Sequence, residues 1–258
     1  MIRKILISVL ITLATVALLG CWFYFVGSLS ADGRQQARCR QVEVILADSL
    51  ESAIVDREAV RAWMEKHTVG KITERINLDS LERQILARGE VMTAQVFATG
   101  PQTVSARITQ RKPVVRFENG QGRWYADPEG YLFPVTHAVD VPVITGTLPF
   151  SLDNNYRGET PEGSRDWMAG MIGLARYIDN KPYLRREISQ IDIAANGDVV
   201  LYTRTSGPAI IFGDPGNCDD KFRKLDVWWR NIAPQLEEGK TYKTINLKYN
   251  QQIICKQL

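Results

Sequence analysis

Two β-strands joined by a turn are predicted by the stretch Val91-Met92-Thr93-Ala94-Gln95-Val96-Phe97-Ala98-Thr99-Gly100-Pro101-Gln102-Thr103-Val104-Ser105-Ala106-Arg107-Ile108-Thr109. Val104, Ala106 and Ile108 alternate with other residues, which is the period-two pattern of a strand with one buried face. The segment between the two strands has the Gly and Pro that turns favour. We therefore expect a hairpin here.

A short strand and two helices are predicted before this hairpin. Val42 to Ile45 indicates the strand, and Asp56 is placed to cap a helix that runs to Lys66. Asn77 or Asp79 opens a second helix, for which Gly89 is placed as the terminator. Its apolar stripe is Leu78, Leu81 and Ile85. The predicted order over residues 40–112 is therefore β-α-α-β-β.

Short strands, turns and two helices are predicted over residues 113–258, which we assign to a mostly antiparallel β domain. Helices are expected from Thr160-Pro161 and after Cys218. The expected strands are Val114 to Phe117, Trp124-Tyr125, Tyr131 to Val135, Ile188 to Ala194, Val199 to Thr203, Ile210 to Phe212, and a last strand that starts near Tyr242. The predicted fold class is α+β.

The N-terminal end has the pattern of a membrane anchor. Residues 5–26 contain no charged side chain, and as a helix they would span about 33 Å, the thickness of the hydrocarbon core of a bilayer. Arg3 and Lys4 favour a cytoplasmic N-terminus. We assign residues 1–26 to the cytoplasmic tip and transmembrane helix, and 27–39 to a linker. A lipoprotein is the alternative, because Leu18-Leu19-Gly20-Cys21 resembles a lipoprotein processing box.

The composition indicates a globular chain with nearly balanced charge. Of 258 residues, 32 are Lys or Arg and 29 are Asp or Glu, a balance that argues against nucleic-acid binding. The four cysteines lack CxxC spacing and the chain has two histidines, which argues against a zinc site. We expect no metal, cofactor, nucleic acid or small-molecule substrate. Cys218 and Cys255 either form a disulfide or remain free thiols.

Several segments resemble the FtsQ/DivIB family of bacterial cell-division proteins. An N-terminal anchor precedes a β-α-α-β-β unit, which is the order of that family's POTRA domain. Arg107 to Val115 is similar to the family's strand leading into a basic residue, Pro and Val, and Tyr125 to Phe133 is similar to its aromatic, Asp and turn segment. The family's Asp-Leu-Arg-Tyr strand is similar to Thr244 to Tyr249. The helix segment Lys221 to Leu225 precedes this strand. Asn246 and Lys248 replace Asp and Arg, and Lys lacks the planar fork of Arg.

The resemblance implies a non-enzymatic scaffold of the division machinery. It places the chain at the septum as a single-pass inner-membrane protein with a cytoplasmic N-terminus and a periplasmic bulk. In this family the last strands of the β domain recruit FtsB and FtsL. The partner-binding residues expected on this strand are Ile245, Lys248, Tyr249, Asn250 and Gln251. We expect it to lie at a sheet edge, where an incoming strand can pair with its backbone; an ordinary core strand is the alternative.

Two further expectations concern Trp228 and enzymatic activity. Trp229 fits the apolar stripe of the last helix, so the adjacent Trp228 is expected either as an exposed anchor for a partner or packed under a loop. No nucleophile elbow accompanies His67 or His137, and we expect no catalytic residues. A membrane-tethered POTRA protein of protein export or outer-membrane assembly is the alternative function, and a lipidated hydrolase is a third.

Overall fold

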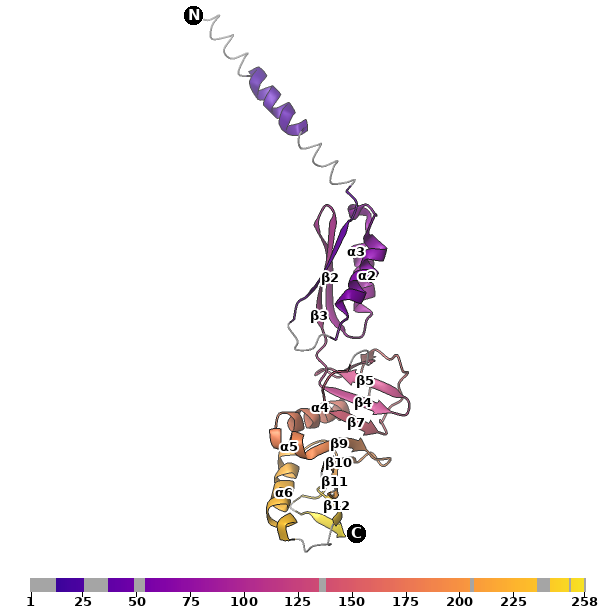
Figure 1. The fold of residues 1–258 in the computed structure, drawn as a ribbon, viewed down its shortest axis with the longest axis vertical. Coiled ribbons are helices and arrows are strands. Elements are labelled where there is room, and N and C mark those ends of the chain that lie inside the picture. The colour runs from indigo at the N-terminus through magenta and orange to yellow at the C-terminus, as the bar shows by residue number, and fades with distance from the viewer. Residues whose placement is uncertain are drawn as a thin grey trace, which may run out of the picture. The chain divides into compact units, whose positions relative to one another are not determined.

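The structure is a computed structural model that describes residues 13–25, 37–48, 54–134, 138–204, 207–235, 242–250 and 252–257 (Figure 1). The chain divides into two compact units. One comprises Met1–Ser49 and Val55–Thr109, and the other comprises Leu50–Ile54 and Gln110–Leu258.

Residues 13–25 form a helix whose apolar side chains are exposed, including Leu13, Trp22 and Phe25. The remainder of the expected transmembrane segment lies outside the described residues. Within the part of the chain that is described, no helix is both long enough and apolar enough to cross a membrane.

The first unit has the predicted β-α-α-β-β order (Figure 1). Its elements are β1 (Gln41–Leu46), α2 (Arg57–Thr68), a short 3-10 helix (Thr73–Arg75), α3 (Leu78–Leu86), β2 (Val91–Gly100) and β3 (Thr103–Gln110). The strands form one sheet in the order β1-β3-β2, with β1 parallel to β3. Buried side chains of the helices and the sheet, among them Val60, Ile85 and Ile108, make up its core.

Side-chain caps begin both helices of this unit, as predicted. Asp56 accepts a hydrogen bond from the Ala59 N–H at 2.9 Å, and Asn77 accepts one from the Ser80 N–H at 2.9 Å. The predicted stop at Gly89 is wrong. Helix α3 ends at Leu86 with Ala87 as its C-cap, because the chain already turns there to enter β2.

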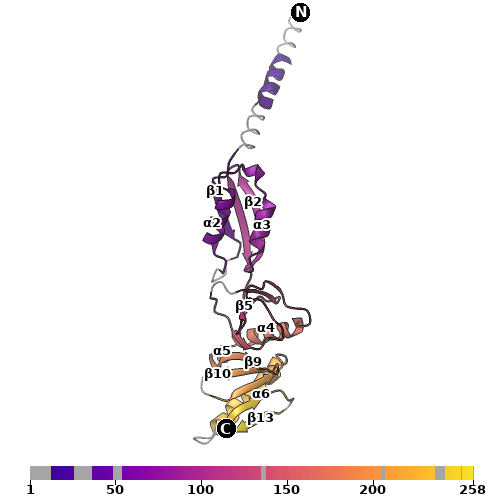
Figure 2. The ribbon, with the colours of Figure 1, turned by 90° about the vertical axis from the view of Figure 1, so that its right-hand side faces the viewer.

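Among the residues that the structure describes, the second unit contains a ten-stranded sheet, three α-helices and one 3-10 helix (Figures 1 and 2). Its elements are β4 (Val115–Asn119), β5 (Gly122–Ala126), β6 (Tyr131–Pro134), β7 (Val143–Gly146), β8 (Gly158–Glu159), α4 (Arg165–Asp179), α5 (Pro182–Glu187), β9 (Ile188–Ile193), β10 (Val199–Thr203), β11 (Ala209–Gly213), α6 (Cys218–Asn231), a 3-10 helix (Ala233–Gln235), β12 (Tyr242–Asn246) and β13 (Ile254–Gln257).

The strand order in this sheet is β13-β12-β11-β10-β9-β7-β4-β5-β6-β8. Six of its nine neighbouring pairs are antiparallel and three are parallel, so the mostly antiparallel sheet is confirmed. Helices α4, α5 and α6 contribute Met171, Leu184 and Phe222 to the same core as the strand residues Leu201 and Ile245.

The prediction of two helices in this unit is wrong, because α5 forms a third. Helix α5 has six residues, too few for a helical periodicity to appear in the sequence. Strands β7, β8 and β13 were also not predicted. Helix α4 begins at Arg165 and not at Thr160-Pro161, because Thr160 is bonded elsewhere: its hydroxyl donates to the Gly130 carbonyl at 2.7 Å.

Candidate partner-binding site

The strand expected at the sheet edge lies one place inside it. β12 is parallel to β11 on one side and antiparallel to β13 on the other, with Ile245 opposite both Ile210 and Cys255. The prediction that the strand starting near Tyr242 forms the edge is therefore wrong. The chain returns after Asn250 and adds β13 outside it. Among the residues that the structure describes, no strand pairs with the other side of β13.

Two of the expected contact residues are buried in the core. Ile245 is 0% exposed and Trp228 is 3% exposed, and the rings of Trp228 and Tyr242 lie 6.2 Å apart. The prediction that Trp228 is an exposed anchor for a partner is therefore wrong. Helix α6 turns Phe222, Leu225 and Trp228 toward the core at a spacing of three residues, which leaves Trp229 only partly buried. Neither Ile245 nor Trp228 can present its side chain to a partner.

Three of the expected residues lie together in the exposed turn after β12. The strand ends at Asn246, so Lys248, Tyr249 and Asn250 belong to the connection to β13. All three are exposed, and Tyr249 has 49% of its surface accessible. Gln251 lies outside the described residues. We call residues 248–250 the C-terminal turn.

A lysine from α6 holds the C-terminal turn in place. The Lys224 ammonium donates to the carbonyls of Leu247 at 3.0 Å and Tyr249 at 2.7 Å. It also lies 3.6 Å from the Asp220 carboxylate, and its side chain is 12% exposed. This role of Lys224 was not predicted from the sequence. Lys224 stands in the segment that resembles the family, but nothing in the sequence indicates which carbonyls it reaches.

Lys248 is paired with a carboxylate of its own chain. Its ammonium lies 2.8 and 2.9 Å from the two oxygens of Asp198, in the hairpin between β9 and β10. This hydrogen bond raises the pKa of Lys248. The Lys248 stem passes over Gly213, where a Cβ would approach its Cγ to 2.6 Å. Gly213 also has a φ of +81°. Glycine is therefore favoured at this position both by the backbone conformation and by the lack of room for a Cβ beside Lys248.

The edge strand also carries an exposed apolar side chain. Ile254 on β13 is 45% exposed. Ile254 begins a row of residues that lie in register across neighbouring strands. The next members of this row are Asn246 on β12, Ile211 on β11 and Val200 on β10. These three neighbours are each partly exposed. A partner strand added to β13 would therefore meet open backbone groups and a partly apolar surface beside them.

The two cysteines of this region are free thiols. Cys218 begins α6 and Cys255 lies on β13. Burial raises the pKa of both thiols. Thiolates are the reactive form of cysteine, so this environment lowers the reactivity of both groups.

Two family models match the chain, one in each unit. Residues 112–256 match the model described as FtsQ/DivIB, C-terminal related. The chain belongs to the FtsQ/DivIB family. Residues 37–109 match a POTRA-like domain, which agrees with the β-α-α-β-β order of the first unit. A comparison with curated proteins gave no match.

Membership of the FtsQ/DivIB family confirms the resemblance seen in the sequence. The family consists of non-enzymatic scaffolds of bacterial cell division. Its matched region, 112–256, contains β12, the C-terminal turn and β13. The candidate site of this FtsQ/DivIB chain therefore lies wholly within the part that defines the family.

Proposed function

We propose that this chain is a scaffold of the division machinery that recruits FtsB- and FtsL-like proteins through β13 and the C-terminal turn. One observation carries the proposal: β13 is the outermost strand of a ten-stranded sheet and has a strand partner on one side only among the described residues. Membership of the FtsQ/DivIB family supports the same function.

The proposed mechanism is the addition of a partner strand to β13. An unpaired strand edge exposes N–H and C=O groups that an incoming strand can satisfy, so the backbone supplies affinity. Specificity would come from side chains beside the edge, chiefly Tyr249 and Ile254. β13 has only four residues and carries the exposed Lys256. A short, charged edge strand limits pairing with unrelated chains.

We also propose that the chain is anchored in the inner membrane by residues 5–26. The uncharged run and the preceding Arg3 and Lys4 support a single pass with a cytoplasmic N-terminus and a periplasmic bulk. A fluorescent fusion of the full-length chain tests the division role of the anchored protein. Concentration of the signal at the septum is the expected result, and an even distribution around the envelope would contradict a divisome scaffold.

Removing the Tyr249 ring tests the site directly. Tyr249→Ala should weaken binding of purified FtsB- and FtsL-like partners by about tenfold, because an exposed aromatic beside the docking edge is a typical binding hot spot. Calorimetric titration with the full-length chain in detergent micelles measures the affinity. Tyr183→Ala is the matched control, since Tyr183 is also exposed, at 40%, but lies on α5. Equal affinity of wild type and Tyr249→Ala would remove Tyr249 from the site.

A charge exchange separates binding from folding at Lys248. Lys248→Glu places a carboxylate beside Asp198 and should both loosen the turn and weaken partner binding. The double variant Lys248→Glu, Asp198→Lys restores the ion pair with its charges reversed. If partner binding stays weak in the double variant, the positive charge of Lys248 itself contacts the partner. Binding that returns to the wild-type value shows that the pair only holds the turn.

A further inference from the structure

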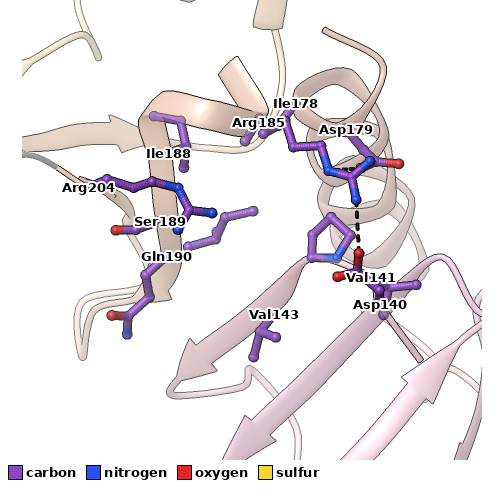
Figure 3. A pocket seen from close by; sticks show the side chains of 12 residues that line it. Asp140, Val141, Val143, Ile178, Asp179, Arg185, Ile188, Ser189, Gln190 and Arg204 are labelled. Carbon is purple, nitrogen blue, oxygen red and sulfur yellow. Dashed lines mark hydrogen bonds and ion pairs between the residues drawn. The ribbon is translucent and has the colours of Figure 1, made fainter. Parts of the chain in front are cut away.

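A pocket of about 260 Å³ opens beside the first residues of β9 (Figure 3). Its floor is aliphatic, because Ile178, Ile188 and Ile191 line it and are themselves 3 to 6% exposed. β9 runs from this pocket to the hairpin that holds Asp198, and its length places the two about 17 Å apart. The pocket is therefore separate from β13 and the C-terminal turn.

One rim of this pocket carries more negative than positive charge. Arg185 lies between two carboxylates, with its Nη2 3.0 Å from Asp140 and its Nε 3.4 Å from Asp179. Figure 3 shows the Arg185–Asp140 contact on the side of the pocket formed by α5 and the segment before β7. With two carboxylates on one guanidinium, this rim has no positive charge left for a ligand.

The opposite rim carries a guanidinium without a counter-charge. Arg204 follows β10 and its backbone is fixed, because its N–H donates to the Glu187 carbonyl at 2.9 Å. Figure 3 shows its exposed side chain turned toward the pocket. Within the described residues no carboxylate lies within ion-pair distance of Arg204, and the same holds for Arg186, which lines the adjoining hollow with it.

We propose that this pocket binds an acidic peptide segment of a protein partner. A carboxylate side chain of that segment would pair with the Arg204 guanidinium, whose planar fork suits two parallel hydrogen bonds. A neighbouring aliphatic side chain would rest on Ile188 and Ile191. Asp140 and Asp179 on the opposite rim repel any anion, and they repel a doubly charged phosphate more strongly than a singly charged carboxylate. The charge pattern therefore favours a single carboxylate beside an apolar group.

Methyl NMR of the full-length chain in detergent micelles tests this binding. The probe is the peptide acetyl-Ser-Val-Glu-Val-Ser-amide, compared with the same peptide carrying Gln in place of Glu. The acidic peptide should shift the Ile188 and Ile191 methyl signals in a saturable way. The Gln peptide should bind about tenfold more weakly, because it loses a charge-assisted pair. Arg204→Gln should weaken binding of the acidic peptide by a similar factor.

Arg223→Gln is the matched control, since Arg223 is an exposed arginine on α6, away from the pocket. It should keep the wild-type affinity within about twofold, which is the scatter expected for a substitution outside the site. Three results would overturn the proposal: equal binding of the two peptides, unchanged affinity in Arg204→Gln, or shifts that appear at Ile254 and not at the pocket. Equal shifts with inorganic phosphate would also overturn it, because the pocket would then be a general anion site.

Discussion

Arg111 and Asp127 form a buried ion pair where β5 turns into β6. Their side chains are 16% and 3% exposed, and Arg111 Nη1 lies 2.7 Å from Asp127 Oδ2. The other Asp127 oxygen accepts hydrogen bonds from the N–H groups of Glu129 and Tyr131 at 3.1 and 2.9 Å. The Arg111 guanidinium also stacks on Tyr131, 3.4 Å from the ring centre. The sequence indicated a turn in this segment, but not the ion pair between Arg111 and Asp127.

Asp127→Asn should lower the free energy of unfolding of the second unit by about 3 kcal/mol, because it leaves the Arg111 charge buried without its partner. Asn keeps an oxygen for the two backbone N–H groups, so the change isolates the charge. Urea denaturation followed by near-ultraviolet circular dichroism measures the loss.

The control for this change is Glu159→Gln in the exposed Arg165–Glu159 pair. That pair has the same 2.7 Å separation, but its side chains are 67% and 76% exposed. Solvent screens such pairs, so the expected loss is below about 1 kcal/mol. Similar losses for Asp127→Asn and Glu159→Gln would contradict the importance of burial for the Arg111–Asp127 pair.

Asp214 makes the stability of the second unit depend on pH at acidic values. Burial acts to raise the pKa of Asp214, but hydrogen bonds from Lys221 at 3.0 Å and from the Gly216 N–H at 2.9 Å outweigh it, and the pKa is lowered below its ordinary 3.8. A lowered folded-state pKa stabilises the fold above the unfolded pKa, and this contribution is lost as the pH falls through the folded value.

Asp214→Asn should therefore destabilise the protein at pH 6, and its effect should be smaller at pH 2, because the contribution of the ionised carboxylate is lost as the pH falls below the ordinary carboxyl pKa of 3.8. Because the Asp214 side chain is 70% exposed, the difference at pH 6 should stay below about 1 kcal/mol. Paired urea titrations at the two pH values measure it. If Asp214→Asn lowered the free energy of unfolding by the same amount at both pH values, ionisation of Asp214 would not contribute to stability.

At the scale of the element, α6 positions the connection between β12 and β13. The Lys224 ammonium donates to two carbonyls of that connection, and a turn held in part by this half-buried side chain should loosen when the side chain loses its donors. Lys224→Met keeps the aliphatic stem and removes the ammonium. It should raise amide exchange rates in residues 247–250 and in β13 by about tenfold, which corresponds to the loss of one charged hydrogen bond.

Hydrogen exchange followed by mass spectrometry measures this effect. Exchange in β9 and β10 should stay at the wild-type rate. The matched control is Lys243→Met on the neighbouring β12, because Lys243 is exposed. An increase that spreads to β9 and β10 would show that Lys224 stabilises the sheet as a whole and not the turn.

At the scale of the whole molecule, the two units have separate hydrophobic cores. Ile85 belongs to the core of the first unit and Phe212 to that of the second, and both are 0% exposed. Each core draws its buried residues from its own unit. A cavity made in one core should therefore leave the packing of the other unchanged.

Ile85→Ala should destabilise the first unit by about 3 kcal/mol and Phe212→Ala the second by about 4 kcal/mol, which are typical costs for cavities in well-packed cores. Hydrogen exchange of the full-length chain measures each unit separately. Ile85→Ala should accelerate exchange in β1, β2 and β3 and leave β10 and β11 unchanged. If one substitution accelerated exchange in the strands of both units, the two cores would not be independent.

The sequence by itself determined the local features and the family. The caps Asp56 and Asn77 and the β-α-α-β-β order depend on side chains within one turn or one strand, so they appear in the sequence as spacing and periodicity. The motifs that resembled the FtsQ/DivIB family are local in the same way, and the match over residues 112–256 confirms them.

Only the tertiary structure decided which strand is outermost and which side chains stay accessible. Alternation in β12 shows that Ile245 is buried, but not whether another strand lies beside it, because backbone pairing leaves no side-chain pattern. The burial of Trp228 in place of Trp229 depended on where α6 meets the sheet. Lys248 pairs with Asp198, which lies 50 positions away. Contacts over such separations follow from how the whole chain packs, and no local spacing records them.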